Sequence, residues 1–212
     1  MLIPIQPVSV DPEKVAFQMC ESGEQVTYAQ LEGRANQVAH LVSDLGIRPG
    51  EHVAVLMNNC RELLELCFGF DRSGVYYTLI STRLTTDEID YIVRDCGARL
   101  FIYASALENV EPDLFAKLPK NLQCMCVGAS VEQSGHGDWR AQCAQKPTSA
   151  IAQALQGGDM LYSSGTTGRP KGVLWPLPKT EAGQATMLVK LLVPLFGYGA
   201  DSHYLSTAPL YH

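Results

Sequence analysis

Residues 162–173 combine side chains and backbone features that could hold a phosphate group. Three glycines let the backbone approach a ligand and point N–H groups into one small volume; they are Gly165, Gly168 and Gly172. Four hydroxyl groups could donate to phosphate oxygens or ligate Mg²⁺; they belong to Ser163, Ser164, Thr166 and Thr167. Lys171 adds a positive charge, and Pro170 before it stiffens the exit. The stretch therefore predicts a phosphate-binding loop between two apolar strands.

Two other interpretations of this stretch are less consistent with its residues. Clusters of Gly, Ser, Thr and Pro are also typical of ordinary surface loops, but such loops rarely combine these glycines and hydroxyls with a lysine. A Walker A loop has Gly-Lys-Ser/Thr after four spacer residues. Here Lys171 follows Pro170 and precedes Gly172, so the stretch does not fit that motif.

The stretch closely resembles the signature of the adenylate-forming superfamily, which includes acyl-CoA synthetases, aryl-CoA ligases, luciferases and the adenylation domains of peptide synthetases. The resemblance implies that the loop holds the β- and γ-phosphates of ATP while a carboxylate attacks the α-phosphate, after which the thiol of CoA displaces AMP. It implies a catalytic role for Lys171, which would offset charge on the leaving pyrophosphate, and Mg²⁺ ligation by Ser163 and Thr167. ATP binding would fall to Ser163, Ser164, Gly165, Thr166, Thr167, Gly168, Lys171 and Gly172.

The last residues, 208–212, read Ala-Pro-Leu-Tyr-His and resemble a second motif of the same superfamily. The resemblance implies that His212 lies where the acid pocket meets the nucleotide. There its imidazole could donate to the substrate carboxylate or to the anionic oxygen of the acyl adenylate, as a second catalytic group. The alternative is a frayed terminal histidine. The motif is more similar to that of the acyl-CoA synthetases than to that of amino-acid-activating enzymes, which favours a fatty acid, with an aryl or terpenoid acid as the alternative.

The elements that must position these motifs alternate between strands and helices. Apolar runs predict strands at 53–57, 75–80, 100–103, 123–127 and 160–162, with 172–175 as an antiparallel partner of the last. Capping boxes at Thr27–Gln30 and Thr85–Glu88 begin helices that end at Gly46 and Cys96, and a third helix runs from Asn58-Asn59 to about Ser73. These βαβ units predict an α/β, Rossmann-like fold with a mostly parallel sheet.

Other segments are expected to be peripheral. Residues 15–20 and 25–28 are predicted to form a small hairpin, 139–156 a helix broken by Pro147, 181–196 an apolar helix and 204–206 a short strand. Residues 128–138 are expected to be an irregular connection, in which His136 is exposed to solvent and has no role.

Composition narrows the class of protein. The chain has 212 residues, 46% hydrophobic and 18% charged. Its net charge of −6 and the lack of a basic run argue against a nucleic-acid-binding surface. No apolar stretch is long enough to span a bilayer, and the N-terminus does not read as a signal peptide. Seven scattered cysteines indicate reduced core thiols in a cytoplasmic protein. A fatty substrate could bring peripheral contact with a membrane, although no basic amphipathic helix supports it.

The resemblance covers nearly the whole chain but only the first part of a family member. We therefore expect residues 1–212 to be an incomplete N-terminal AMP-binding domain, without the rest of that domain and without the small C-terminal domain. Such a piece would not complete catalysis alone, and its unpaired sheet edge would favour a homo-oligomer. The alternatives are a stand-alone nucleotide-binding or dimerising module without turnover, and an inert fold with a degraded loop.

Overall fold

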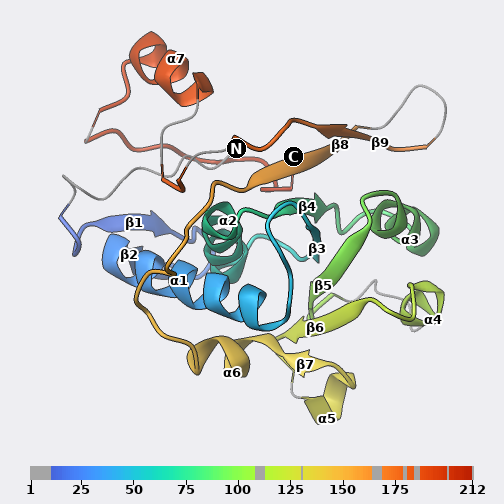
Figure 1. Cartoon of the computed structure of the whole chain (residues 1–212). Helices are drawn as coiled ribbons and strands as arrows, with labels where there is room; N and C mark the ends of the chain where they lie inside the picture. Colours follow the sequence, from blue (N-terminus) through green and yellow to red (C-terminus); the bar gives the residue numbers. More distant parts are fainter. Residues whose placement is uncertain are drawn as a thin grey trace.

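The computed structural model of the chain describes residues 11–107, 113–129, 131–163, 169–178, 181–183, 187–199 and 201–211 (Figure 1). Its sheet strands are β3 His52–Leu56, β4 Tyr76–Ile80, β5 Ala98–Ala104, β6 Gln123–Val127, β7 Gly137–Asp138, β8 Gly158–Ser163 and β9 Lys171–Leu174. They lie in the order β7-β6-β5-β3-β4-β8-β9. All neighbours are parallel except β8 and β9. The predicted α/β fold with a mostly parallel sheet is confirmed.

Helices cover both faces of this sheet. One face carries α1 Tyr28–Asp44, α2 Arg61–Ser73 and α6 Trp139–Ala144, and the other carries α3 Thr86–Asp95 and α4 Leu114–Lys117. Along β3, Val53 and Val55 point into the first core, whereas Ala54 and Leu56 point into the second. A strand buried on both faces needs apolar residues at every position. This is why residues 53–57 form a continuous apolar run.

The order in which strands are added to the sheet changes direction beside β3: β4 is added on one side of it and β5 on the other. The crossover from β3 to β4 packs α2 on one face, and the crossover from β4 to β5 packs α3 on the opposite face and places β5 on the far side of β3. The connections leaving β3 and β5 therefore separate to opposite faces. In doubly wound sheets, ligands bind outside the carboxyl ends of the strands at such a switch point.

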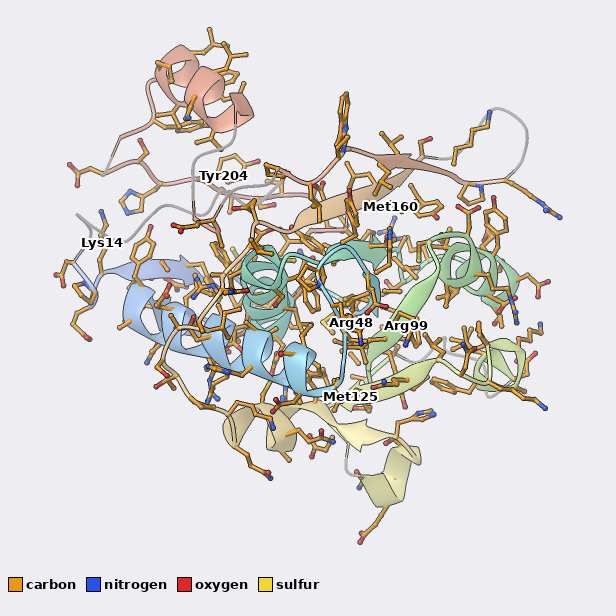
Figure 2. The ribbon with its side chains drawn as sticks, viewed as in Figure 1. Lys14, Arg48, Arg99, Met125, Met160 and Tyr204 are labelled. Carbon is orange, nitrogen blue, oxygen red and sulfur yellow. The ribbon has the colours of Figure 1, made fainter. Side chains whose placement is uncertain are left out.

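A close contact between backbones places β8 beside β4. Gly157 N donates to Asp71 O at 2.6 Å, and Gly158 N donates to Val75 O at 3.1 Å. A Cβ on Gly157 would lie 2.3 Å from Phe70 O, so no other residue fits this position without a shift of the backbone. Further along, the buried Thr78 hydroxyl donates to Met160 O at 3.1 Å. Met160 itself lies where β8 passes over the second core (Figure 2).

The connection from α6 to β8 is held against α1 by polar side chains. Asn36 Nδ2 donates to Thr148 O at 2.8 Å, Gln37 Nε2 donates to Lys146 O at 2.9 Å, and His40 Nε2 donates to Ser149 O at 3.0 Å. The prediction of a helix over 139–156 is wrong beyond Ala144, where α6 ends. These carbonyls bond to α1 instead of to a helix of their own, and Pro147 lies among them.

Several peripheral predictions are confirmed. Strands β1 Val15–Gln18 and β2 Gln25–Thr27 pair as an antiparallel hairpin, and both capping boxes are present. The connection 128–138, however, contains a short helix, α5 Val131–Ser134, and the edge strand β7. All seven cysteines are free, but Cys20 is exposed in the turn between β1 and β2 and is not a core residue.

Near the end of the chain, the predicted apolar helix is confirmed except for its start, and the predicted strand at 204–206 is wrong. The apolar helix is α7 Met187–Phe196, whereas Glu181 forms an isolated antiparallel bridge with Leu155. Residues 204–206 form no strand, because within the described part of the chain no strand lies beside them and their side chains are exposed. Tyr204, labelled in Figure 2, is 79% exposed. In the described residues, no helix is long and apolar enough to cross a membrane.

An acidic side chain is buried where α2, β4 and β8 meet. Asp71 is only 6% exposed and accepts a hydrogen bond from the Tyr77 hydroxyl at 3.4 Å. Burial, together with the nearby Asp159, raises the pKa of Asp71 to about 8. The folded chain therefore holds a proton on Asp71 at pH values where the unfolded chain has released it.

This protonation predicts a pH-dependent loss of stability. The contribution of neutral Asp71 is fully present below the unfolded pKa near 4 and is lost as the pH rises towards the folded pKa near 8, by about 1 kcal/mol per pH unit. Asp71→Asn cannot ionise, so its unfolding free energy, measured by urea titration, should fall less steeply than that of the unmodified chain from pH 5 to 8. Asp201→Asn, at a fully exposed position, is the control. Parallel curves for the unmodified chain and Asp71→Asn would contradict the prediction.

Candidate functional site

The predicted phosphate loop begins beyond the carboxyl ends of the parallel strands. Strand β8 runs parallel to β4, so Ser163 at its end lies on the same side of the sheet as the carboxyl ends of β3, β4 and β5. The chain returns antiparallel as β9, and Ser163 is the direct cross-strand partner of Lys171. Both residues are exposed. The predicted binding residues Ser164, Gly165, Thr166, Thr167 and Gly168 lie outside the described residues.

Gly172 pairs with Tyr162 across the same hairpin. A Cβ on Gly172 would lie 2.3 Å from Met160 Cε and 3.1 Å from Tyr162 Cζ. Glycine at this position thus makes room for two side chains of β8. The sequence suggested Gly172 for close approach to a ligand, and the structure adds a packing reason for the same residue.

Helix α3 holds both ends of the loop. Before the loop, the Tyr162 hydroxyl donates to Asp95 Oδ2 at 2.6 Å. After it, the Arg169 guanidinium lies 5.5 Å from the centre of the Tyr91 ring, a cation–π distance. Tyr91 and Asp95 are four residues apart, on one face of α3. Burial and the hydrogen bond to Asp95 raise the pKa of Tyr162, so the phenol stays protonated as the donor.

These α3 contacts were not predicted from the sequence. Tyr91 and Asp95 stand in the helix predicted to begin after Thr85, and nothing in its pattern pointed to residues some seventy positions later. The available signal was weak: two polar side chains at helical spacing next to the core residues Ile92 and Val93.

The exit from β9 is fixed by Tyr76, the first residue of β4. Its hydroxyl donates to Trp175 O at 3.0 Å and accepts from Leu177 N at 3.1 Å. Its ring stacks on His52 with 4.8 Å between ring centres. Burial lowers the pKa of His52, which favours the neutral ring in this stack. The chain after β9 is therefore attached to the edge of the parallel sheet.

The second motif returns to the carboxyl end of β3. Residues 209–211 are partly buried, and Leu210 N donates to Asn59 Oδ1 at 2.8 Å. His212, the other predicted catalytic residue, lies outside the described residues.

The prediction that His136 is exposed to solvent is wrong. It is half-buried, with Nδ1 2.8 Å from the Tyr103 hydroxyl, and it packs on the Phe115 ring. The reason is the pairing of β7 with β6, which brings the preceding residue against the end of β5.

The donor groups at the hairpin suit a nucleotide phosphate. Ser163 and Lys171 offer an exposed hydroxyl and an exposed ammonium side by side, and both are groups that bind phosphate oxygens. The Ser163 hydroxyl is also a hard oxygen ligand of the kind Mg²⁺ takes. Doubly wound parallel sheets commonly bind nucleotides outside the carboxyl ends of their strands, where this hairpin also turns. Comparison with known proteins specifies the family: the AMP-binding enzymes match residues 6–212, and the chain belongs to them.

Similar proteins include several ligases that act on acids. The 3-oxocholest-4-en-26-oate–CoA ligase of Rhodococcus rhodochrous is 31% identical over 79% of this chain and 31% of its own length. The long-chain-fatty-acid–CoA ligase FadD13 of Mycobacterium tuberculosis is 32% identical over 80% of this chain and 33% of its own length. The chain thus spans about a third of the length of these relatives.

Solved structures show the same fold. The anthranilate CoA ligase AuaEII, in complex with anthranoyl-AMP, matches with a TM-score of 0.68 and 28% identity over 79% of this chain and 31% of its own. ATP-bound MatB from Rhodopseudomonas palustris matches with a TM-score of 0.59 and 28% identity over 76% of this chain and 31% of its own. These matches confirm the predicted fold, which is that of the N-terminal part of adenylate-forming enzymes.

The contact between β8 and α3 predicts a measurable loss of stability. Tyr162→Phe removes the donor to Asp95 and should lower the unfolding free energy by about 1 kcal/mol, since the bond is charge-assisted but partly exposed to water. Urea titration would measure it. Tyr91→Phe is the matched control, because it loses only a long 3.4 Å contact to the same carboxylate and keeps the ring beneath Arg169. Equal stabilities of Tyr162→Phe and the unmodified chain would refute the prediction.

Proposed function

We propose that the chain is the phosphate-binding part of an acid–CoA ligase. The complete enzyme would use ATP and Mg²⁺ to convert a carboxylic acid to its acyl adenylate and would then transfer the acyl group to CoA. Residues 1–212 would be an incomplete N-terminal AMP-binding domain, followed in the complete enzyme by the rest of that domain and a small C-terminal domain. Family membership and the third of the relatives' length that the chain spans both support this proposal.

The pairing of Ser163 with Lys171 at the carboxyl edge of the sheet is the observation that carries the proposal. It supports placing a hydroxyl and an ammonium at the two ends of the same short loop, so a phosphate chain held there would meet both. Exposure of both side chains leaves them available to a ligand.

The residues divide the proposed chemistry between them. Ser163, Ser164, Thr166, Thr167 and the N–H groups of Gly165, Gly168 and Gly172 would hold the β- and γ-phosphates. Lys171 would offset negative charge as pyrophosphate leaves, and His212 would donate to the acid or to the adenylate oxygen. Mg²⁺, when bound to Ser163 and Thr167, would neutralise phosphate charge. The Tyr162 and Arg169 contacts to α3 would hold both ends of the loop.

The acid is best tested directly. A fatty acid is our first expectation from the second motif, and FadD13 agrees with it; AuaEII, an anthranilate ligase, keeps an aryl acid as the alternative. ATP–pyrophosphate exchange should be measured with fatty, aryl and amino acids, on the product of the native gene and on the 212-residue chain side by side. Exchange that depends on a fatty acid, by the former alone, is the expected result. No exchange with any acid by a folded product would favour a binding module without turnover.

Lys171→Ala should reduce acid-dependent pyrophosphate exchange about 100-fold or more, because an electrostatic group aimed at developing charge commonly contributes that much. Lys190→Ala removes an equally exposed lysine from α7 and should leave exchange unchanged. The same exchange assay measures both variants. Near-normal exchange by Lys171→Ala would remove the assigned role.

The exposed edge of the sheet supports self-association of the 212-residue chain. All four residues of β9 are exposed, and Leu161, Val173, Leu174 and Trp175 are large apolar side chains that remain 45–75% accessible. Unpaired edges with apolar side chains pair readily with a second copy.

We also propose a cytoplasmic location for the protein, which the free thiols support. A fatty substrate would add peripheral contact with a membrane to this proposal.

Light scattering across concentrations should therefore detect a dimer or a larger species of the 212-residue chain. Leu174→Lys, which places a charge on the edge strand, should shift the chain towards monomer. Val15→Lys, at an exposed position of β1 in the other sheet, is the control. A monomer at every concentration for the unmodified chain would contradict self-association.

A further inference from the structure

The end of the described chain is held against the body of the protein at Leu210. Residues 201–208 are exposed, whereas Pro209, Leu210 and Tyr211 are partly buried. The Leu210 side chain packs against the first core, the one beneath α1 and α2. Its backbone N–H donates to Asn59 Oδ1 at 2.8 Å, across 151 residues of sequence. The segment 209–211 is thus held at one defined place.

That place is the switch point of the sheet. Asn59 follows β3 and directly precedes Cys60, the N-cap of α2, on the side of the sheet where β4, β5 and β8 also end. The neighbouring Asn58 has a different partner: its Oδ1 accepts from the Thr82 hydroxyl, beyond the end of β4, at 3.0 Å. The two adjacent asparagines therefore make different contacts, and among the described residues of the second motif it is Asn59 that bonds to Leu210.

We infer that Asn59 is a positioning residue for the acid-binding step of the second motif. The inference rests on the proposed function, in which His212 of this motif donates to the acid or to the adenylate oxygen. The hydrogen bond fixes the backbone one residue before Tyr211, the last described residue of the motif. Asn59 acts through Leu210 and needs no contact with the substrate.

Hydrogen exchange of the 212-residue chain tests the contact without any activity. Asn59→Ala should speed exchange of the Leu210 amide roughly fivefold, the factor expected for one exposed hydrogen bond. Asn59→Asp keeps an acceptor oxygen and should restore slow exchange. Asn58→Ala, the matched control, should leave the Leu210 amide unchanged. Equal exchange in Asn59→Ala and the unmodified chain would overturn the inference, and unchanged exchange in β5 would show that the variant is folded.

Kinetics of acid-dependent pyrophosphate exchange by the product of the native gene test the role. Asn59→Ala should raise the KM for the acid about three- to tenfold and leave the KM for ATP unchanged, because a loosened second motif affects the acid side of the site. Asn58→Ala should change neither. A KM for ATP that rises equally, or a fall in kcat alone, would overturn the positioning role. If the unmodified protein shows no pyrophosphate exchange, the proposed function is refuted, and the acid-binding role of Asn59 with it. The hydrogen-exchange result for the Leu210 amide would still test the contact between Asn59 and Leu210.

Discussion

The close backbone contact at Gly157 is the constraint on which the placement of the site depends. The N–H groups of residues 157 and 158 bond to carbonyls at the end of α2 and just before β4, and there is no space at Gly157 for a side chain. This contact starts the pairing of β8 with β4. Because β9 and both ends of the phosphate loop follow from β8, their position depends on the two backbone hydrogen bonds of Gly157 and Gly158, which precede Lys171 in the sequence.

Helix α3 links the core to the site. Its buried face, with Ile89, Ile92 and Val93, packs on the sheet, and its exposed Asp95 and half-buried Tyr91 contact the two ends of the loop. Packing of the buried face therefore determines where Asp95 and Tyr91 meet Tyr162 and Arg169. The guanidinium of Arg169 lies over the Tyr91 ring, which attracts the positive charge by a cation–π interaction.

The parts of the fold that follow from local pattern could be predicted. Apolar runs located β3, β4 and β6, and the Thr27–Gln30 and Thr85–Glu88 boxes located the starts of two helices. Contacts between distant residues could not be read this way: the α6–β8 connection follows α1 because Asn36, Gln37 and His40 bind its carbonyls. The hydrogen bond between Tyr162 and Asp95 could not be predicted either, because it forms only once the crossover through α3 has been placed. For the site, residue types predicted a phosphate-binding loop at 162–173, the resemblance supplied the individual roles and His212, and the structure added the pairing of Ser163 with Lys171 and the residues that support the loop ends.

The three side chains of α1 that hold residues 146–149 also affect how the chain can fold. Strand β8 must reach β4 across some eighty intervening residues, and closing a loop of that length costs conformational entropy that grows with its logarithm. Attachment at α1 divides this loop into two shorter ones, and the second is only about ten residues long. Once α1 has packed on α2, β8 is held near its final neighbour. The assembly of the hairpin thus becomes a local search after a single long-range step.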